Sequence, residues 1–227
     1  APTLAPVDNV TTPTNDNTTL NYTFSSTEYG NITYGGLCSS SGDNTSVGGP
    51  DNAPANNAIT FNALAEGTYG PDNCTIAVTD NASNTSDNLS VSSFTIDTVK
   101  PVLAEVTAVT TPTNDTTPAY SFSSTEAGTN SYGGSCGSSS TSATSSGLDN
   151  VTIILTHTDN STALSERLYG DCRIKVTDAA GNTSDALPVN TFEVDITAPT
   201  VDSTYPTNDN SSISVSDNIS VTFSKSM

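Results

Sequence analysis

Apolar and polar residues alternate along most of the chain, between turns rich in Gly, Pro, Asn and Asp. In the stretch that starts at Cys74, the side chains of Cys74, Ile76 and Val78 share one face, whereas those of Thr75 and Thr79 lie on the other. A period of two residues is typical of a β-strand with one buried face. The same alternation predicts further strands at residues 20–24, 32–34, 59–61, 120–122, 151–155 and 172–176. We therefore predict an all-β protein in which the cysteine faces the core.

The cysteine-bearing stretch occurs twice, and its landmarks lie 98 residues apart: Cys74 and Cys172, Asp80 and Asp178, Asp97 and Asp195. A repeat of this length corresponds to one whole domain. The sequence thus predicts domain 1 at residues 1–98, domain 2 at residues 99–197, and the first strands of a third, incomplete domain at residues 198–227.

The last strand of each repeat changes its alternation part-way. Leu89 and Val91 share one parity, whereas Phe94 and Ile96 have the opposite parity. An extra residue in one strand of an antiparallel pair shifts the alternation in this way. We interpret the change as a β-bulge.

The four cysteines have the same spacing in both repeats: 36 residues separate Cys38 from Cys74 and Cys136 from Cys172. This spacing predicts one intradomain disulfide per repeat, and closing a loop of that size stabilises a fold by roughly 4 kcal/mol. A zinc site is disfavoured, since the chain has no CxxC pair and a single histidine, His157. Disulfides form in oxidising compartments, so we expect an extracellular or cell-surface location.

Acidic residues outnumber basic ones by 24 to 5, which gives a net charge of −19. Such a surface does not neutralise phosphates, so nucleic acid is excluded as a partner. No run of about twenty apolar residues is present, and no membrane insertion is expected. The second repeat alone carries an insertion with His157, Glu166 and Arg167, which we interpret as a solvated loop. Because no nucleophile and base pair recurs, no enzyme activity is expected.

Three features carry a family resemblance: the Leu64-x-x-Gly67-x-Tyr69 approach to the cysteine strand, the turn at residues 179–182, and the proline-ending linkers after Asp97 and Asp195. Together they resemble the tandem immunoglobulin-like domains of large bacterial cell-surface adhesins and fibres. The resemblance implies immunoglobulin-like β-sandwiches and a structural role as a stalk or spacer. Tyr69 and Tyr169 also resemble the tyrosine corner of such sandwiches. They precede the cysteine by five and three residues rather than two, which leaves their hydrogen bond open.

Residues 198–227 have a different pattern, with a turn at Pro206 and expected strands at residues 213–215 and 219–223. This pattern resembles the opening strands of the immunoglobulin-like domain type found in surface-layer proteins. Two or three strands do not close a sandwich, so their apolar faces need a partner. Two interpretations stay open: the domain continues beyond Met227, or another chain supplies the missing strands by β-augmentation.

The family resemblance also implies calcium at the domain junctions, where ions stiffen related rods. The candidate ligands are aspartates at strand ends and turns: Asp80, Asp97, Asp178 and Asp195. Calcium takes about six to eight oxygen ligands, and acidic turns provide carboxylates and carbonyls. The alternative is that these aspartates only cap backbone amides in turns.

We therefore expect a structural stalk or spacer segment of an extracellular adhesin or surface fibre, in contact with neighbouring repeats of the same or identical chains. One alternative is a filament subunit that assembles through its C-terminal strands. Another is a binding module that uses the polar loops at residues 39–57 and 137–150. Asn-x-Ser/Thr sequons predict a glycoprotein if the source glycosylates asparagine. They include Asn9, Asn17, Asn21, Asn31, Asn44, Asn73, Asn150 and Asn218.

Overall fold

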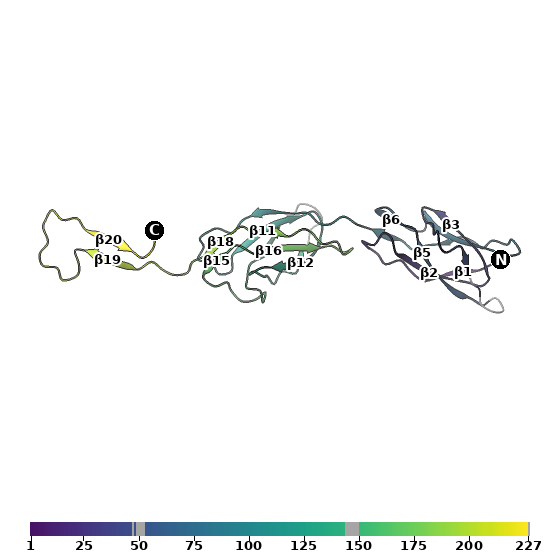
Figure 1. Ribbon diagram of the computed structural model, residues 1–227, viewed down its shortest axis with the longest axis horizontal. Coiled ribbons are helices and arrows are strands. Elements are labelled where there is room, and N and C mark those ends of the chain that lie inside the picture. Colours follow the sequence, from purple (N-terminus) through teal and green to yellow (C-terminus); the bar gives the residue numbers. More distant parts are fainter. Residues whose placement is uncertain (47, 49–52, 144–149, 227) are drawn as a thin grey trace.

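The computed structural model describes residues 1–46, 48, 53–143 and 150–226, and every regular element in these ranges is a β-strand. The strands form two sandwiches and a terminal hairpin, which follow one another along a long axis (Figure 1). Within the described ranges there is no helix of the length and apolarity needed to cross a membrane. The all-β prediction is confirmed.

The first sandwich contains the strands β1 (Leu4–Asp8), β2 (Leu20–Ser26), β3 (Gly30–Gly36), β4 (Thr45–Ser46), β5 (Ala55–Phe61), β6 (Gly67–Tyr69), β7 (Cys74–Asp80), β8 (Leu89–Ser90) and β9 (Phe94–Ile96). One sheet has the order β1-β2-β5 and the other the order β4-β3-β7-β8, while β6 pairs with β9. Side chains from all three groups meet in one core. Two antiparallel sheets in this relation are the immunoglobulin-like arrangement.

The second sandwich contains the strands β10 (Leu103–Thr107), β11 (Ala119–Ser124), β12 (Gly128–Gly133), β13 (Ser142–Ala143), β14 (Asn150–Ile154), β15 (Arg167–Tyr169), β16 (Arg173–Thr177), β17 (Leu187–Pro188) and β18 (Phe192–Val194). Its sheets have the orders β10-β11-β14, β13-β12-β16-β17 and β15-β18, which repeat those of the first sandwich. The chain is thus a tandem of immunoglobulin-like β-sandwiches.

Each sandwich encloses its own cluster of buried side chains, and the two clusters share no residue. In the first cluster, the ring of Phe61 lies 6.0 Å from that of Tyr22 and 6.5 Å from that of Phe94. In the second, Tyr169 stacks on Phe192 at 5.1 Å. Large rings fill these thin cores because a few aromatic side chains bury much apolar area.

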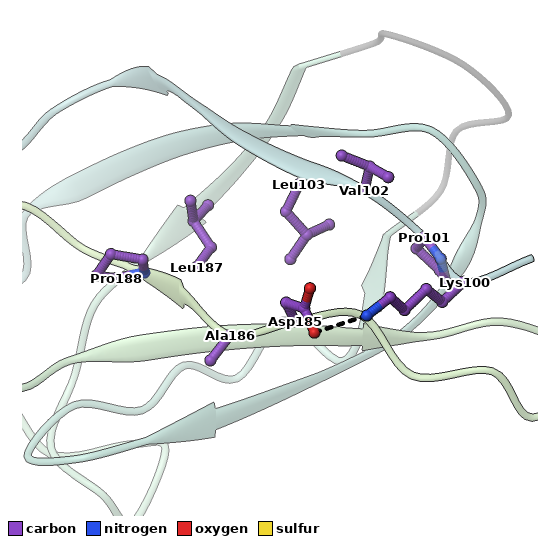
Figure 2. A pocket seen from close by; sticks show the side chains of 8 residues that line it. All are labelled: Lys100, Pro101, Val102, Leu103, Asp185, Ala186, Leu187 and Pro188. Atoms are coloured by element: carbon purple, nitrogen blue, oxygen red, sulfur yellow. Dashed lines mark hydrogen bonds and ion pairs between the residues drawn. The ribbon is translucent and has the colours of Figure 1, made fainter.

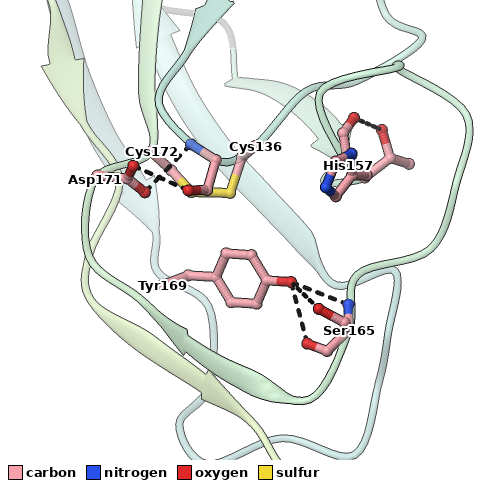
Figure 3. Close-up of a disulfide and its surroundings, with 8 residues drawn as sticks. Cys136, His157, Ser165, Tyr169, Asp171 and Cys172 are labelled. Atoms are coloured by element: carbon pink, nitrogen blue, oxygen red, sulfur yellow. Dashed lines mark hydrogen bonds between the residues drawn. A yellow bond between two sulfur atoms is a disulfide. The ribbon is translucent and has the colours of Figure 1, made fainter.

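The four cysteines pair within their repeats. Cys38 is bonded to Cys74 with a Cα–Cα distance of 5.1 Å, and Cys136 to Cys172 with a distance of 5.2 Å (Figure 3). In each pair, the first cysteine lies in the loop after a strand, β3 or β12. The second cysteine lies at the neighbouring strand of the same sheet: Cys74 begins β7, and Cys172 directly precedes β16. Each disulfide therefore links neighbouring strands of one sheet, whereas the disulfide of antibody domains joins two sheets.

The β-bulge interpretation of the last strand is wrong. The parity changes because the strand is interrupted: β8 pairs with β7 in one sheet, whereas β9 pairs with β6. Val91 and Phe94 flank the crossing and are both buried. The chain thus leaves one sheet and joins another with apolar side chains turned inward on both sides of the break.

A short segment near the start of each sandwich runs parallel to the last strand. Thr14 N donates to Thr95 O at 3.0 Å and Thr14 O accepts from Asp97 N at 2.9 Å. Thr113 makes the same two contacts in the second sandwich, with Glu193 O and Asp195 N, both at 2.9 Å. The beginning and the end of each sandwich are therefore hydrogen-bonded to each other.

The tyrosine before each cysteine makes the hydrogen bond of a tyrosine corner. Tyr69 OH donates to Ala65 O at 2.9 Å. Tyr169 OH donates to Ser165 O at 3.1 Å and accepts from Ser165 N at 3.0 Å (Figure 3). The altered spacing from the cysteine leaves this contact intact, because the partner lies four residues upstream of the tyrosine in both repeats.

The C-terminal residues form a hairpin of β19 (Val201–Tyr205) and β20 (Ser220–Phe223). Within the described part of the chain these two strands pair only with each other. Val201, Val221 and Phe223 are 55%, 46% and 39% exposed, so the apolar face of the hairpin is uncovered. The strand expected at residues 213–215 is absent, and Val215 there is fully exposed, since nothing packs against it.

We expect replacement of Cys38 and Cys74 by alanine to lower the free energy of unfolding of the first sandwich by about 4 kcal/mol. The second sandwich should keep its stability, because the two cores share no side chain. Denaturant unfolding followed by two-dimensional NMR separates the two transitions. The matched variant lacking Cys136 and Cys172 should destabilise only the second sandwich. Equal losses in both sandwiches from either variant would contradict independent cores.

Candidate metal centre at the domain junction

Asp97 lies where the first sandwich ends and the linker begins. It directly follows β9, and its backbone N–H is held by the carbonyl of Thr14. Its carboxylate Oδ1 accepts a hydrogen bond from Val99 N at 3.1 Å. Both contacts fix the position of a half-buried carboxylate at the end of the sandwich.

Asp178 lies in the turn after β16, and Asn182 of the same turn holds its side chain. Asp178 Oδ1 accepts from Asn182 N and Oδ2 accepts from Asn182 Nδ2, both at 2.9 Å. Asp80 makes the same contacts with Asn84 at 2.8 and 2.9 Å, and the Asn84 side chain is the main cause that lowers the pKa of Asp80. Turn capping is therefore present in both repeats. A carboxylate has about four acceptor sites, so capping does not use all of them.

The structure brings a third carboxylate to this pair. Asp97, Glu126 and Asp178 each offer an oxygen within 4.8 Å of the other two, and all three residues are half-buried. Burial, followed by the nearby charges of Asp97 and Asp178, raises the pKa of Glu126. Three carboxylates that repel one another are the kind of ligand set that a hard divalent cation such as Ca²⁺ prefers.

Of the four predicted ligands, the structure unites only Asp97 and Asp178. Asp80 ends β7, before the corresponding turn of the first sandwich, and Asp195 lies at the end of the second. Glu126 was not among the predicted residues. Its signal in the sequence is the stretch Ser-Ser-Thr-Glu, which occurs at residues 123–126, at the end of β11, and again at residues 25–28, at the end of β2. Glu28 is therefore the equivalent of Glu126.

Hydrogen bonds cross the junction beside these carboxylates. Asn182 Nδ2 donates to Asp97 O at 2.8 Å, and Asn15 N donates to Ala180 O at 3.2 Å. The linker is also tied to the second sandwich, because Lys100 Nζ lies 2.7 Å from Asp185 Oδ1 (Figure 2). The two sandwiches are thus connected by more than the covalent linker.

The second junction has the same plan with a different charge. Lys225 occupies the position of Glu126. The residue before Lys225 is Ser224, whose Oγ accepts a hydrogen bond from Thr200 N at 2.9 Å. The residue before Glu126 is Thr125, whose Oγ1 accepts the equivalent hydrogen bond from Val102 N. Lys225 Nζ donates to Asp195 Oδ1 and, at 3.0 Å, to Thr197 O. The ammonium of Lys225 lowers the pKa of Asp195. Here the protein supplies its own cation next to the aspartate that ends the sandwich.

No protein-family model matches the chain, and no curated protein matches it. Among solved structures, the chain is similar to the "D00-D0 domain of Intimin". The two sequences are 14% identical, and the matched region covers 83% of this chain and 99% of that chain with a TM-score of 0.35.

We expect Asn182→Ala to loosen the junction, whereas the matched variant Asn84→Ala should not. Each variant loses the capping of its own aspartate, at a cost of about 1 kcal/mol in its sandwich. Only Asn182 also donates across the junction, to Asp97 O. Residual dipolar couplings of the two sandwiches report their relative orientation. An unchanged orientation in the Asn182 variant, or an equal change in both variants, would contradict this role.

Proposed function

We propose that this chain is a stalk or spacer segment of an extracellular adhesin or surface fibre. The observation that carries the proposal is the junction, where Asn15, Asp97 and Lys100 bind the second sandwich through Ala180, Asn182 and Asp185. Contacts of this kind hold consecutive sandwiches in line rather than leaving them on a free tether. The disulfides support a location in an oxidising compartment outside the cytoplasm.

The reach of such a segment follows from strand geometry. The longest strands have 7 residues, which at ~3.3 Å per residue span about 23 Å, and the turns at both ends lengthen each sandwich further. Because the sandwiches follow one another end to end, each repeat adds its long axis to the distance spanned (Figure 1). The net charge of −19 further opposes folding of one sandwich onto another.

A filament subunit is the second candidate, and the free hairpin supports it. β20 pairs only with β19 in the described part of the chain, whereas β2 and β11 each have a second neighbour, β5 and β14. An unpaired strand edge with exposed apolar side chains is a template for a strand from another molecule.

We expect the full chain to be a monomeric rod in solution. Small-angle scattering should give a maximum dimension above roughly 50 Å, more than twice the span of the longest strands. Light scattering on the same sample gives the mass, and a mass that increases with concentration would support the filament candidate instead. Val221→Lys, which places a charge on the uncovered face of β20, should abolish such growth. A compact monomer with both sandwiches side by side would contradict the stalk.

We also propose that Ca²⁺ binds Asp97, Glu126 and Asp178 and stiffens the junction. The three carboxylates repel one another without a cation, and Ca²⁺ would bridge the first sandwich, through Asp97, to the second. The remaining ligands would be carbonyl oxygens and water, as is common for this ion. Lys225 supports the proposal, because a cation also lies beside the corresponding aspartate, Asp195, at the next junction.

We expect Ca²⁺ at a hundredfold excess over its Kd to raise the free energy of unfolding by about 2.7 kcal/mol. Glu126→Gln should remove most of this gain, because it removes one charged ligand. Glu126→Lys should make the junction insensitive to Ca²⁺, since the ammonium would face Asp97 as Lys225 faces Asp195. Thermal unfolding with Ca²⁺ or a chelator measures these effects.

The matched control is Glu28→Gln, which changes the equivalent position of the first sandwich, away from this junction. It should leave the response to Ca²⁺ intact. The calcium proposal would be contradicted if Ca²⁺ did not stabilise the unmodified protein, or if it stabilised the Glu126→Gln variant equally. The stalk proposal does not depend on that outcome, because scattering tests it separately.

A further inference from the structure

We propose that the first sandwich carries N-linked glycans at Asn9, Asn44 and Asn88, beside the edge strands of its two sheets. Each of these residues begins an Asn-x-Ser/Thr sequon, the acceptor motif for glycosylation of asparagine. The inference rests on the location outside the cytoplasm that is part of the proposed function, because this motif is modified in exported chains.

Sequons are more frequent in this chain than its composition explains. Of the 23 asparagines, 15 are followed two residues later by Ser or Thr, with no proline between. Ser and Thr together make up 72 of the 227 residues, so a random order would give about 7 sequons. The sequence therefore favours the motif itself and not only the residue types that compose it.

Burial separates the sequon asparagines from some of the others. Among the asparagines whose side chains the structure describes, only Asn57 and Asn130 are buried, and neither begins a sequon. None of the sequon asparagines in this set is buried, and most are exposed. A glycan is bulky and hydrated, so the sequons lie where the fold accommodates one.

The three proposed sites lie next to edge strands. Asn9 directly follows β1, Asn44 directly precedes β4, and Asn88 directly precedes β8. These strands are edges of the sheets with the orders β1-β2-β5 and β4-β3-β7-β8. An edge strand presents unpaired N–H and C=O groups to other chains. A glycan at each of these positions would hinder such pairing.

The side chains of these three asparagines are available for the reaction. All three are exposed, and none makes a side-chain hydrogen bond within the described part of the chain. In the transfer, Nδ2 attacks the anomeric carbon of a sugar donor with a diphosphate leaving group, which the exporting cell supplies. The C–N bond forms, the C–O bond to the diphosphate breaks, and the diphosphate takes the electron pair of that bond and one amide proton. The modified asparagine keeps one N–H.

Asn182 also begins a sequon, but its contacts are incompatible with a glycan. Its Nδ2 donates to Asp97 O at 2.8 Å and to Asp178 Oδ2 at 2.9 Å. An asparagine amide has two N–H donors, and a bond to sugar removes one of them. Modification of Asn182 would therefore break one of these two contacts at the junction. We expect Asn182 to stay unmodified in the folded protein.

The second sandwich lacks all three sites. Strand pairing and backbone contacts place Ala108, Thr141 and Ala186 at the positions of Asn9, Asn44 and Asn88. Beside Ala186, the ion pair of Lys100 with Asp185 connects the linker before β10 to the segment before β17 (Figure 2). The two sandwiches thus differ in how the neighbourhood of these edge strands is occupied.

The test is glycopeptide mass spectrometry on the protein isolated from the cells that produce it, with electron-transfer fragmentation to locate the added mass. We expect sugar on Asn9, Asn44 and Asn88 and none on Asn182. Unmodified asparagine at all three positions would overturn the proposal, and sugar on Asn182 would contradict the selection by side-chain contacts. Neither result affects the stalk proposal, which scattering tests separately.

Variants at Asn88, produced in the same cells, test whether the sequon directs the modification. Asn88→Gln should remove one glycan and leave those on Asn9 and Asn44. Ser90→Ala keeps Asn88 but removes the hydroxyl of the sequon, so the same glycan should be lost. Ser90→Thr restores the motif and should restore the glycan. Both changes at Ser90 affect an exposed residue, which keeps the fold intact. Sugar that persists on Asn88 in the Ser90→Ala variant would contradict the proposal.

Discussion

Packing of two thin sheets around a few large side chains is the constraint on which each sandwich depends. Only 33% of the residues are hydrophobic, so the loss of one ring such as Phe61 affects much of the available apolar contact. The disulfide compensates by linking two points of the chain that are 36 residues apart and lie beside the core. Within the loop closed by its disulfide, the second sandwich has Leu155 where the first has Phe61, and it keeps the same sheet order.

The two junctions show how one arrangement accommodates opposite charges. An aspartate ends each sandwich, Asp97 in one case and Asp195 in the other, and the next segment presents a side chain to it from the same position. Glu126 makes that contact repulsive, whereas Lys225 makes it attractive. The residue at this position therefore determines whether the contact with the aspartate is repulsive or attractive, while the backbone contacts of the sandwich ends stay the same.

Local patterns predicted the main strands of the two sandwiches, the repeat and the cysteine pairs, because each of these depends on spacing along one segment, whereas the strand predicted at residues 213–215 is absent. The break between β8 and β9 was mistaken for a bulge, since both produce the same change of parity and only the partner strands differ. Glu126 was not predicted as a neighbour of Asp97 because their proximity depends on how two separate sandwiches meet.

The parallel segment at the start of each sandwich has a mechanical consequence. Tension applied through the two linkers pulls Thr14 and Ile96 in opposite directions along the line of their pairing. The hydrogen bonds of Thr14 with Thr95 and Asp97 are then loaded together, in shear, instead of being unzipped one after another. Thr113 provides the same resistance in the second sandwich. A sandwich built this way keeps its length under load until both hydrogen bonds fail together.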